Sequence, residues 1–177
     1  MKVPFYLLGL LIRYGPQHGY KLKQIVEERI SDFAKIKLPT IYYHLDKLKE
    51  KGYVTETLDK DGNRPEKMVY CITGSGKKYF NELFMKQLEE SLTLELPLDG
   101  VLYFMDNIGN DALLKELRNK NQEIIKKLDS LKKRRAITLR NIHEQGRFSA
   151  EAIFEHHFCH LEAEHVWLTK MIEGLST

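Results

Sequence analysis

The chain has 177 residues, of which 42% are hydrophobic and 30% are charged, and its formal net charge at pH 7 is +3. This composition excludes an intrinsically disordered protein, and the longest apolar run, residues 5–12, is too short to cross a bilayer. The first residues lack the features of a signal peptide, so we expect a cytoplasmic protein without a membrane partner. Positive charge is concentrated in residues 1–90, with 16 Lys and Arg against 12 Asp and Glu, while residues 91–177 have 12 against 13.

The first part of the chain predicts three helices joined by short links. Residues 4–12 form an apolar run with a proline near its start and a Gly-Pro stop after it. Residues 19–30 and 39–52 follow helical spacing, with Lys and Glu at many of the other positions. Three short helices in sequence predict a compact trihelical unit.

The pattern then changes to that of strands. Residues 53–58 alternate and are rich in β-branched side chains, residues 59–63 are a turn sequence, and residues 67–73 predict a second strand. Gly74-Ser75-Gly76 closes this strand, and residues 77–90 predict another helix. Three helices followed by a hairpin are typical of a winged helix-turn-helix, which we assign to a DNA-binding domain ending near residue 90.

The third predicted helix combines a buried stripe with an outward surface of mixed donors. Ile41, Leu45 and Leu48 share one side of the helix and are expected to face the core. The residues turned outward are Thr40, Tyr43, His44, Lys47 and Lys51, with Tyr42 at the edge. Hydroxyl, imidazole and ammonium donors beside aromatic rings suit a DNA major groove, where side chains contact base edges and phosphates. We therefore predict that this helix binds double-stranded DNA.

Further DNA contacts are expected outside the third helix. The candidates near the hairpin tip are Lys60, Asn63, Arg64 and Lys67. They are placed to hold flanking phosphates, although three acidic residues of the same segment dilute the charge. Tyr20, in the second helix, either contacts a phosphate or packs under the third helix without touching DNA.

Residues 91–177 predict a second domain that is entirely helical. A long helix is expected over residues 110–145, where Gly146 stops it. A last helix is expected over residues 149–173, with Ser149 as its cap. The fold class is therefore mainly α with a small β-hairpin: an N-terminal winged helix-turn-helix and a C-terminal helical dimerisation region, which is also a candidate effector-binding region.

The two long helices carry apolar stripes that predict self-association. Apolar residues of the first follow alternating steps of three and four, with Asn121 and Arg135 at polar seam positions, as in a coiled coil. An isolated helix pair is not expected to bury both stripes, so we predict a homodimer. The predicted dimerisation residues are Leu117, Ile124, Leu128, Leu131, Phe154, Leu161, Leu168 and Ile172.

Three stretches of the N-terminal half, taken together, resemble the PadR family of bacterial transcriptional regulators. They are "HGYKLKQIVEERI", "PTIYYHLDKLKEKGYV" and "NRPEKMVYCITGSGKKYF". They match the family's His/Tyr-Gly-Tyr helix opening, its Thr-x-Tyr recognition helix with a Leu-x-x-Leu-x-x-x-Gly ending, and its second wing strand with an Arg before a Tyr, here Arg64 and Tyr70. The resemblance covers residues 4–88, and the two-helix tail is similar in length and pattern to the longer members.

The resemblance implies a dimeric DNA-binding regulator, usually a repressor, which in many members is relieved by phenolic or other small aromatic compounds. The family's site positions fall on Tyr20, Thr40, Tyr42, Arg64 and Lys67. Two departures concern the recognition helix, where the family usually has glycine in place of Pro39 and proline in place of Tyr43. Pro39 is compatible with a first helical turn, whereas Tyr43 changes the chemistry that faces the groove.

Two alternative functions remain open. One is a winged-helix module that binds protein instead of DNA, which the mixed charges of the hairpin tip favour. The other is a metal-responsive regulator, because His156 and His160 lie four residues apart with Glu164 on the same face and Cys159 adjacent. Surfaces rich in His and Glu are usually only solvated, so we expect no metal.

Enzymatic activity and cofactor binding are not expected. The sequence has no Gly-rich phosphate loop, no nucleophile elbow and no paired acidic motif. Cys71 and Cys159 match no metal or redox spacing, so we expect free thiols. Trp167, the single tryptophan, is expected to pack in the helical core, with stacking on an aromatic effector as the alternative.

Overall fold

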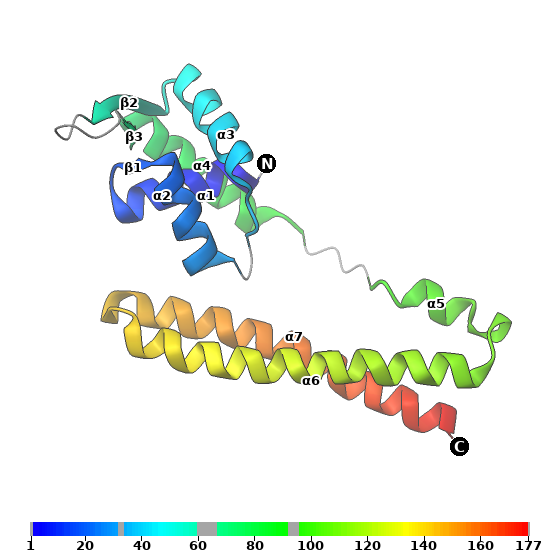
Figure 1. The fold of residues 1–177 in the computed structure, drawn as a ribbon. Helices are drawn as coiled ribbons and strands as arrows, with labels where there is room; N and C mark the ends of the chain where they lie inside the picture. The colour runs from blue at the N-terminus through cyan, green and yellow to red at the C-terminus, as the bar shows by residue number, and fades with distance from the viewer. Residues whose placement is uncertain (1, 32–33, 60–66, 92–95, 177) are drawn as a thin grey trace. The chain divides into compact units, whose positions relative to one another are not determined.

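The computed structural model describes residues 2–31, 34–59, 67–91 and 96–176 (Figure 1). Contacts divide the chain into two compact units, Met1–Thr93 and Leu94–Thr177. Each unit is built on a hydrophobic core of its own. Among the described residues, no helix has both the length and the apolar character needed to cross a membrane.

The first unit is a winged helix-turn-helix, so the predicted fold class is confirmed. Its helices are α1 (Lys2–Tyr14), α2 (Gly19–Ile25), a π-helical turn (Val26–Ile30) that continues α2, α3 (Leu38–Glu50) and α4 (Gly74–Glu89). Its strands are β1 (Gln17–His18), β2 (Val54–Asp59) and β3 (Lys67–Ile72). Figure 1 shows the β2–β3 hairpin extending beside α3, with α1, α2 and α4 below it in this view.

The core of the first unit fixes the orientation of α3. Ile41, Leu45 and Leu48 are buried, as the helical spacing predicts, and pack with Leu7 and Leu22 of α1 and α2. Burying a leucine side chain stabilises a fold by about 1.5–3 kcal/mol. These residues therefore hold one side of α3 in the core and leave the other side at the surface.

The sheet contains one more strand than the sequence predicts. Its order is β1-β3-β2 with antiparallel pairing throughout. Tyr70 lies opposite Gln17 of β1 on one side and opposite Glu56 of β2 on the other. A strand of two residues is too short to show an alternating pattern, which is why the sequence predicts only the hairpin.

Helix α4 begins at Gly74, three residues before its predicted start. Thr73 caps it, because the Thr73 Oγ1 accepts a hydrogen bond from the backbone N of Gly76 at 3.0 Å. The same hydroxyl donates to the carbonyl oxygen of Gly52, at the end of α3, at 2.8 Å. Gly76 is required there, since a Cβ would lie 2.0 Å from the carbonyl oxygen of Tyr53. The Gly-Ser-Gly stretch is therefore the first turn of a helix, and the prediction that it only closes the strand is wrong.

The second unit is a long helical hairpin with a short helical segment before it. Its elements are α5 (Asp99–Tyr103), a 3-10 turn (Met105–Asn107), α6 (Asn110–Asn141) and α7 (Glu144–Ser176). Helices α6 and α7 run antiparallel and pack along their length (Figure 1).

The predicted boundary between the two long helices is wrong. The link consists of residues 142–143 alone, and Gly146 lies buried in the first turn of α7, where its N donates to the carbonyl oxygen of His143 at 2.9 Å. A glycine stops a helix when it adopts a left-handed conformation, and among the described glycines only Gly15 and Gly52 have positive φ. Gly146 therefore does not end α6, and Ser149 lies inside α7 instead of capping it.

The apolar stripes of α6 and α7 face each other within one chain. Leu113, Leu117 and Leu168 form the centre of this core, and Trp167 packs against it, as expected. Leu128, Leu131 and Phe154 are also buried, and Ile124, Leu161 and Ile172 are half-buried. The residues predicted for dimerisation are thus used first inside the hairpin, and their role between two chains remains a prediction.

A polar cluster interrupts the seam between α6 and α7. His165 Nδ1 donates to the Asn121 Oδ1 at 2.6 Å, and the Asn121 Nδ2 donates to the Thr169 Oγ1 at 3.4 Å. The Thr169 Oγ1 in turn donates to the carbonyl oxygen of His165 at 2.9 Å. These bonds form in one alignment of the helices only, so Asn121 fixes their register in the way its seam position predicts. Arg135 is exposed and takes no such part.

Candidate DNA-binding surface

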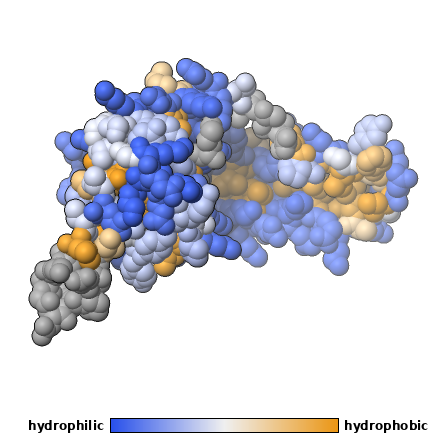
Figure 2. Space-filling view, turned by 90° about the horizontal axis from the view of Figure 1, so that it is seen from above, coloured by the Kyte–Doolittle hydropathy of each residue, from blue (hydrophilic) through white to orange (hydrophobic). Residues whose placement is uncertain are grey.

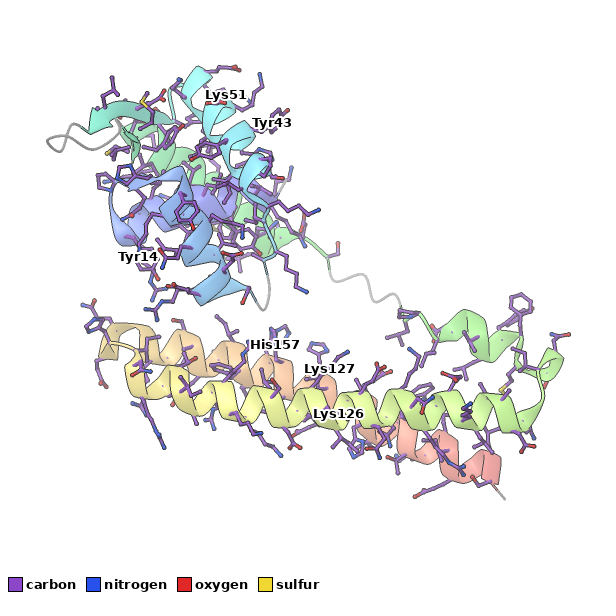
Figure 3. All side chains as sticks on the ribbon, in the orientation of Figure 1. Tyr14, Tyr43, Lys51, Lys126, Lys127 and His157 are labelled. Atoms are coloured by element: carbon purple, nitrogen blue, oxygen red, sulfur yellow. The ribbon has the colours of Figure 1, made fainter. Side chains whose placement is uncertain are left out.

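The outward side of α3 is the centre of the candidate surface. Pro39 occupies the first turn of the helix, where its missing N–H costs nothing. Tyr43 is 59% exposed, Tyr42 is 40% exposed and Lys47 is exposed. Figure 3 shows the labelled side chains of Tyr43 and Lys51 pointing away from the core. These residues are placed as the sequence predicts, on the side opposite the buried stripe.

His44 lies against Tyr43 at the edge of this surface. Their ring centroids are 5.1 Å apart with an interplanar angle of 78°, an edge-to-face contact. His44 is half-buried, and this burial lowers the pKa of its imidazole below the ordinary value of 6.5. The ring is therefore neutral at pH 7 and offers one donor and one acceptor instead of a positive charge.

Two lysines of α3 are paired with carboxylates. The Lys47 Nζ donates to the Glu50 Oε2 at 2.7 Å, and this hydrogen bond raises the pKa of Lys47. Lys49 is paired in the same way with Glu56 of β2. The Lys47–Glu50 pair is exposed on both sides, and exposed ion pairs contribute little to stability, so Lys47 can exchange its carboxylate for a phosphate at small cost. The side chain of Glu56 is only 13% exposed, so Lys49 is held more firmly by its partner.

Tyr42 packs onto the start of α2. A Cβ on Gly19 would lie 2.5 Å from Cε1 and 2.8 Å from Cζ of the Tyr42 ring, so the ring occupies the space that a side chain at Gly19 would need. Tyr42 therefore links α3 to the N-terminus of α2. The helical pattern places Tyr42 at the edge of α3 but gives no sign of Gly19 as its partner, since the two residues meet only in the folded unit.

Beneath this contact, Tyr70 of β3 is buried. Burial is the main cause that raises the pKa of its hydroxyl to about 12, and the neighbouring Glu56, Asp46 and Tyr42 add to the effect. Tyr70 is thus a neutral group at every physiological pH and supports the surface without taking part in a charge change.

The remaining predicted contact residues are placed as follows. Tyr20 is 69% exposed at the start of α2, so it does not pack under α3, and its phosphate contact remains a prediction. Thr40 is half-buried at the start of α3. Lys60, Asn63 and Arg64 lie outside the described residues, and for Lys67 only the backbone, paired with Asp59 at the start of β3, is described.

The histidine cluster of α7 brings two of its candidates together. His156 Nε2 and His160 Nε2 are 3.0 Å apart, with the rings edge to face. Among the described residues, no group of three His, Cys, Asp or Glu is close enough to hold a metal ion, and Glu164 joins no such group. Cys71 and Cys159 are free thiols, as expected.

Residues 7–82, which include α3 and the wing strands, match the family model described as the transcriptional regulator PadR-like family. A curated relative, the negative transcriptional regulator PadR of Bacillus subtilis (strain 168), is 30% identical over 86 residues. These residues are 49% of this chain and 47% of that protein, so the match spans about half the length of the curated relative.

Several solved structures share the fold of the whole chain. Bacillus subtilis PadR in complex with operator DNA has a TM-score of 0.83 and 21% identity, with 99% of this chain and 98% of that chain covered. The same protein in complex with p-coumaric acid has a TM-score of 0.78 and 20% identity over 99% and 97%. The Vibrio cholerae virulence activator AphA has a TM-score of 0.79 and 20% identity over 98% of each chain. The winged helix-turn-helix fold of the first unit and the family model thus agree, and residues 7–82 belong to the PadR-like family of transcriptional regulators.

Proposed function

We propose that this chain is a sequence-specific DNA-binding repressor of transcription that acts as a homodimer and binds its operator through α3. The observation that carries the proposal is the outward side of α3, where Tyr43 and Lys47 are exposed on a helix whose other side is fixed in the core. A helix of this kind in a PadR-like unit can enter a major groove and bring hydrogen-bond donors and an aromatic ring to the base edges.

The charge of the surface supports a phosphate-binding role. Lys37, Lys47, Lys49 and Lys51 are exposed on α3 or directly beside it. Each lysine that neutralises a phosphate releases a counterion, so binding should weaken steeply as salt is raised. His44 adds no charge at pH 7, which makes it a candidate for base contact.

The experiment measures binding of the purified chain to the DNA upstream of its own gene, with fluorescence anisotropy as the readout at several salt concentrations. Tyr43→Ala should weaken binding at every salt concentration, and Lys47→Ala should also reduce the salt slope by about one. Lys86→Ala, at an exposed lysine of α4, is the matched control. Variants that bind like the wild type would exclude α3 as the reader and favour a protein partner for this surface.

The homodimer is proposed to form through the second unit. Phe148 is 83% exposed and Val166 is 51% exposed, and their spacing of about five helical turns places them on one face of α7. Exposed apolar residues on one face suit a second copy of the chain. Phe148→Asp with Val166→Asp should yield a monomer in light scattering, whereas Ile153→Asp, on a different face, should leave the dimer intact.

A small aromatic effector is the last part of the proposal. It is supported by the complex of Bacillus subtilis PadR with p-coumaric acid and by the partly buried Trp167 in the core of the second unit. Titration with p-coumaric acid should change the fluorescence of Trp167, the single tryptophan, and should release the operator duplex. A transcription assay on the same promoter decides the sign of regulation, since AphA is described as an activator.

A further inference from the structure

Two exposed histidines of α7 share one face of the helix. His156 and His160 lie four positions apart, which is about one helical turn. Both side chains are exposed, and their Nε2 atoms are 3.0 Å apart. The pair belongs neither to the core of the second unit nor to the candidate DNA-binding surface. The proposed function therefore gives these two side chains no role.

The distance between the two rings shows more than the sequence spacing does. From spacing alone we expect a solvated surface, because two side chains on one face can still turn apart. The rings of His156 and His160 instead lie edge to face, with centroids 4.6 Å apart and an interplanar angle of 83°. Two imidazoles at this helical spacing form a chelating pair for a transition-metal ion when a nitrogen of each ring reaches the same point.

The separation of the two nitrogens distinguishes between kinds of metal ion. An imidazole nitrogen binds such an ion at about 2.0–2.1 Å, so two ligands at a right angle are about 2.8–3.0 Å apart, and two at a tetrahedral angle are about 3.3–3.4 Å apart. The observed 3.0 Å matches the right angle. Nitrogen and oxygen ligands at right angles are typical of Cu²⁺ and Ni²⁺, whereas tetrahedral ligands are typical of Zn²⁺.

The charge of the surrounding segment favours a cation. Residues 151–164 of α7 include four Glu and no Lys or Arg. Part of the exposed hydrophobic surface of the second unit lies away from this segment, near α5, where Phe104 is 60% exposed, at the right-hand end in Figure 2. The segment around the histidine pair thus attracts positive ions.

The neighbouring histidine adds no competing charge. Burial is the main cause that lowers the pKa of His157, and His156, Arg134 and His160 add to the effect. His157 is therefore neutral at pH 7. Arg134, on α6, lies close enough to contribute to this shift, but the carboxylates of the α7 segment outnumber it.

We propose that His156 and His160 chelate one divalent copper or nickel ion on α7. Since no third His, Cys, Asp or Glu among the described residues joins the pair, water supplies the remaining ligands. In the metal-free protein one Nε2–H donates to the other Nε2. Metal binding requires a lone pair on both nitrogens, so the proton of the donating ring moves to its Nδ1 and both rings stay neutral. The site needs no DNA and does not depend on the proposed function.

The test is isothermal titration calorimetry with NiCl₂ on the full chain, purified without a polyhistidine tag. We expect one ion per chain, and at least about tenfold weaker binding in His156→Ala and in His160→Ala, because each variant loses the intramolecular second ligand. His143→Ala, at an exposed histidine between α6 and α7, is the matched control and should bind like the wild type. Equal affinity in the wild type and the two pair variants, or no binding by the wild type, would overturn the inference.

Two further variants test the identity and placement of the ligands. His160→Ala with Ala163→His keeps the number of histidines but places the second ring two turns from His156, so it should bind no more tightly than His160→Ala. Cys159→Ser should bind like the wild type, because the Sγ of Cys159 faces the Glu155 Oε1 at 4.0 Å. Loss of binding in Cys159→Ser would mean a thiolate site and would refute the two-histidine site. Tighter binding of Zn²⁺ than of Ni²⁺ would contradict the right-angle geometry.

A last measurement needs no substitution. Ni²⁺ is paramagnetic, so at low ratios of metal to protein it should broaden the imidazole signals of His156 and His160 before those of the other histidines. Broadening that begins at another histidine would overturn the inference even if one of the variants misfolds.

Discussion

The two units of this chain bury their apolar residues in different ways. The first unit buries short stripes from four helices and a sheet around one centre, and its glycines and caps are placed by close contacts such as Gly76 against Tyr53. The second unit buries one long seam between two helices, with a polar cluster at Asn121. In the first unit, several helices and strands pack against one another, so the position of each surface side chain is closely fixed. In the second unit, the seam fixes the register of two helices but leaves most of each helix exposed. This difference fits the proposal that the first unit recognises a DNA sequence and that the second meets another copy of the chain or a ligand.

The largest effects should come from the two cores. Leu45→Ala and Leu168→Ala each remove a buried leucine from one unit and should each lower the free energy of unfolding by about 4 kcal/mol. If the units are independent, each variant should lower the unfolding midpoint of its own unit only, as measured by urea unfolding with backbone amide exchange as a local probe. A single shared transition that shifts equally in both variants would contradict the contrast between the units.

Gly76→Ala tests the close packing of the first unit. The added Cβ would lie 2.0 Å from a backbone oxygen, which cannot move aside cheaply, so we expect a loss of about 3 kcal/mol. Gly74→Ala, where nothing lies within 4 Å of the added Cβ, is the control and should change stability little. Equal midpoints for the two variants in thermal unfolding would refute the contact between α4 and the end of α3.

Gly19→Ala tests the placement of Tyr42. Here the obstacle is the end of a side chain, so the ring should turn away, the fold should persist and DNA affinity should fall about tenfold in anisotropy. The double variant Gly19→Ala with Tyr42→Ala should bind no more weakly than Tyr42→Ala alone, because both changes remove the same contact. Additive losses would mean that Gly19 acts in some other way.

Asn121→Leu should have the smallest effect on stability, and it tests the polar cluster that sets the register of the second unit. The substitution leaves the Nδ1 of His165 without its partner and should lower the free energy of unfolding by about 1 kcal/mol. It should also allow α6 and α7 to pack in more than one register. Asn119→Leu, at an exposed position of the same helix, is the control. Thermal unfolding gives the first quantity, and the sharpness of methyl signals along the seam gives the second.

The same contrast explains what the sequence could predict. The stripe of Ile41, Leu45 and Leu48 follows one helix period, so the buried side of α3 and its outward surface follow from local spacing alone. The apolar steps of α6 and α7 likewise indicate their buried faces, but the sequence assigned these faces to a second chain, whereas they pack against each other within one chain. Local patterns carry this information because neighbouring turns of a helix share a face.

Contacts between distant parts of the chain were not predictable in this way. The need for glycine at position 19 arises from Tyr42 on another helix, and strand β1 exists only because β3 offers it an edge. Gly146 is a similar case. A glycine after a helical stretch commonly ends the helix, but here the backbone N of Gly146 bonds to the carbonyl oxygen of His143 and the residue lies in the first turn of α7. The helical spacing of α3 was therefore enough to predict the candidate surface, but it could not predict the residues on other elements that position its side chains.

The hydroxyl of Thr73 has a mechanical consequence. It joins the carbonyl of Gly52, where α3 ends, to the first turn of α4, and the Ser75 Oγ donates to the same carbonyl at 2.9 Å. Two side chains thus clamp the end of α3 to the first turn of α4. A change in the tilt of α4 is therefore passed on to the end of α3, so these two helices of the first unit should turn together and not independently.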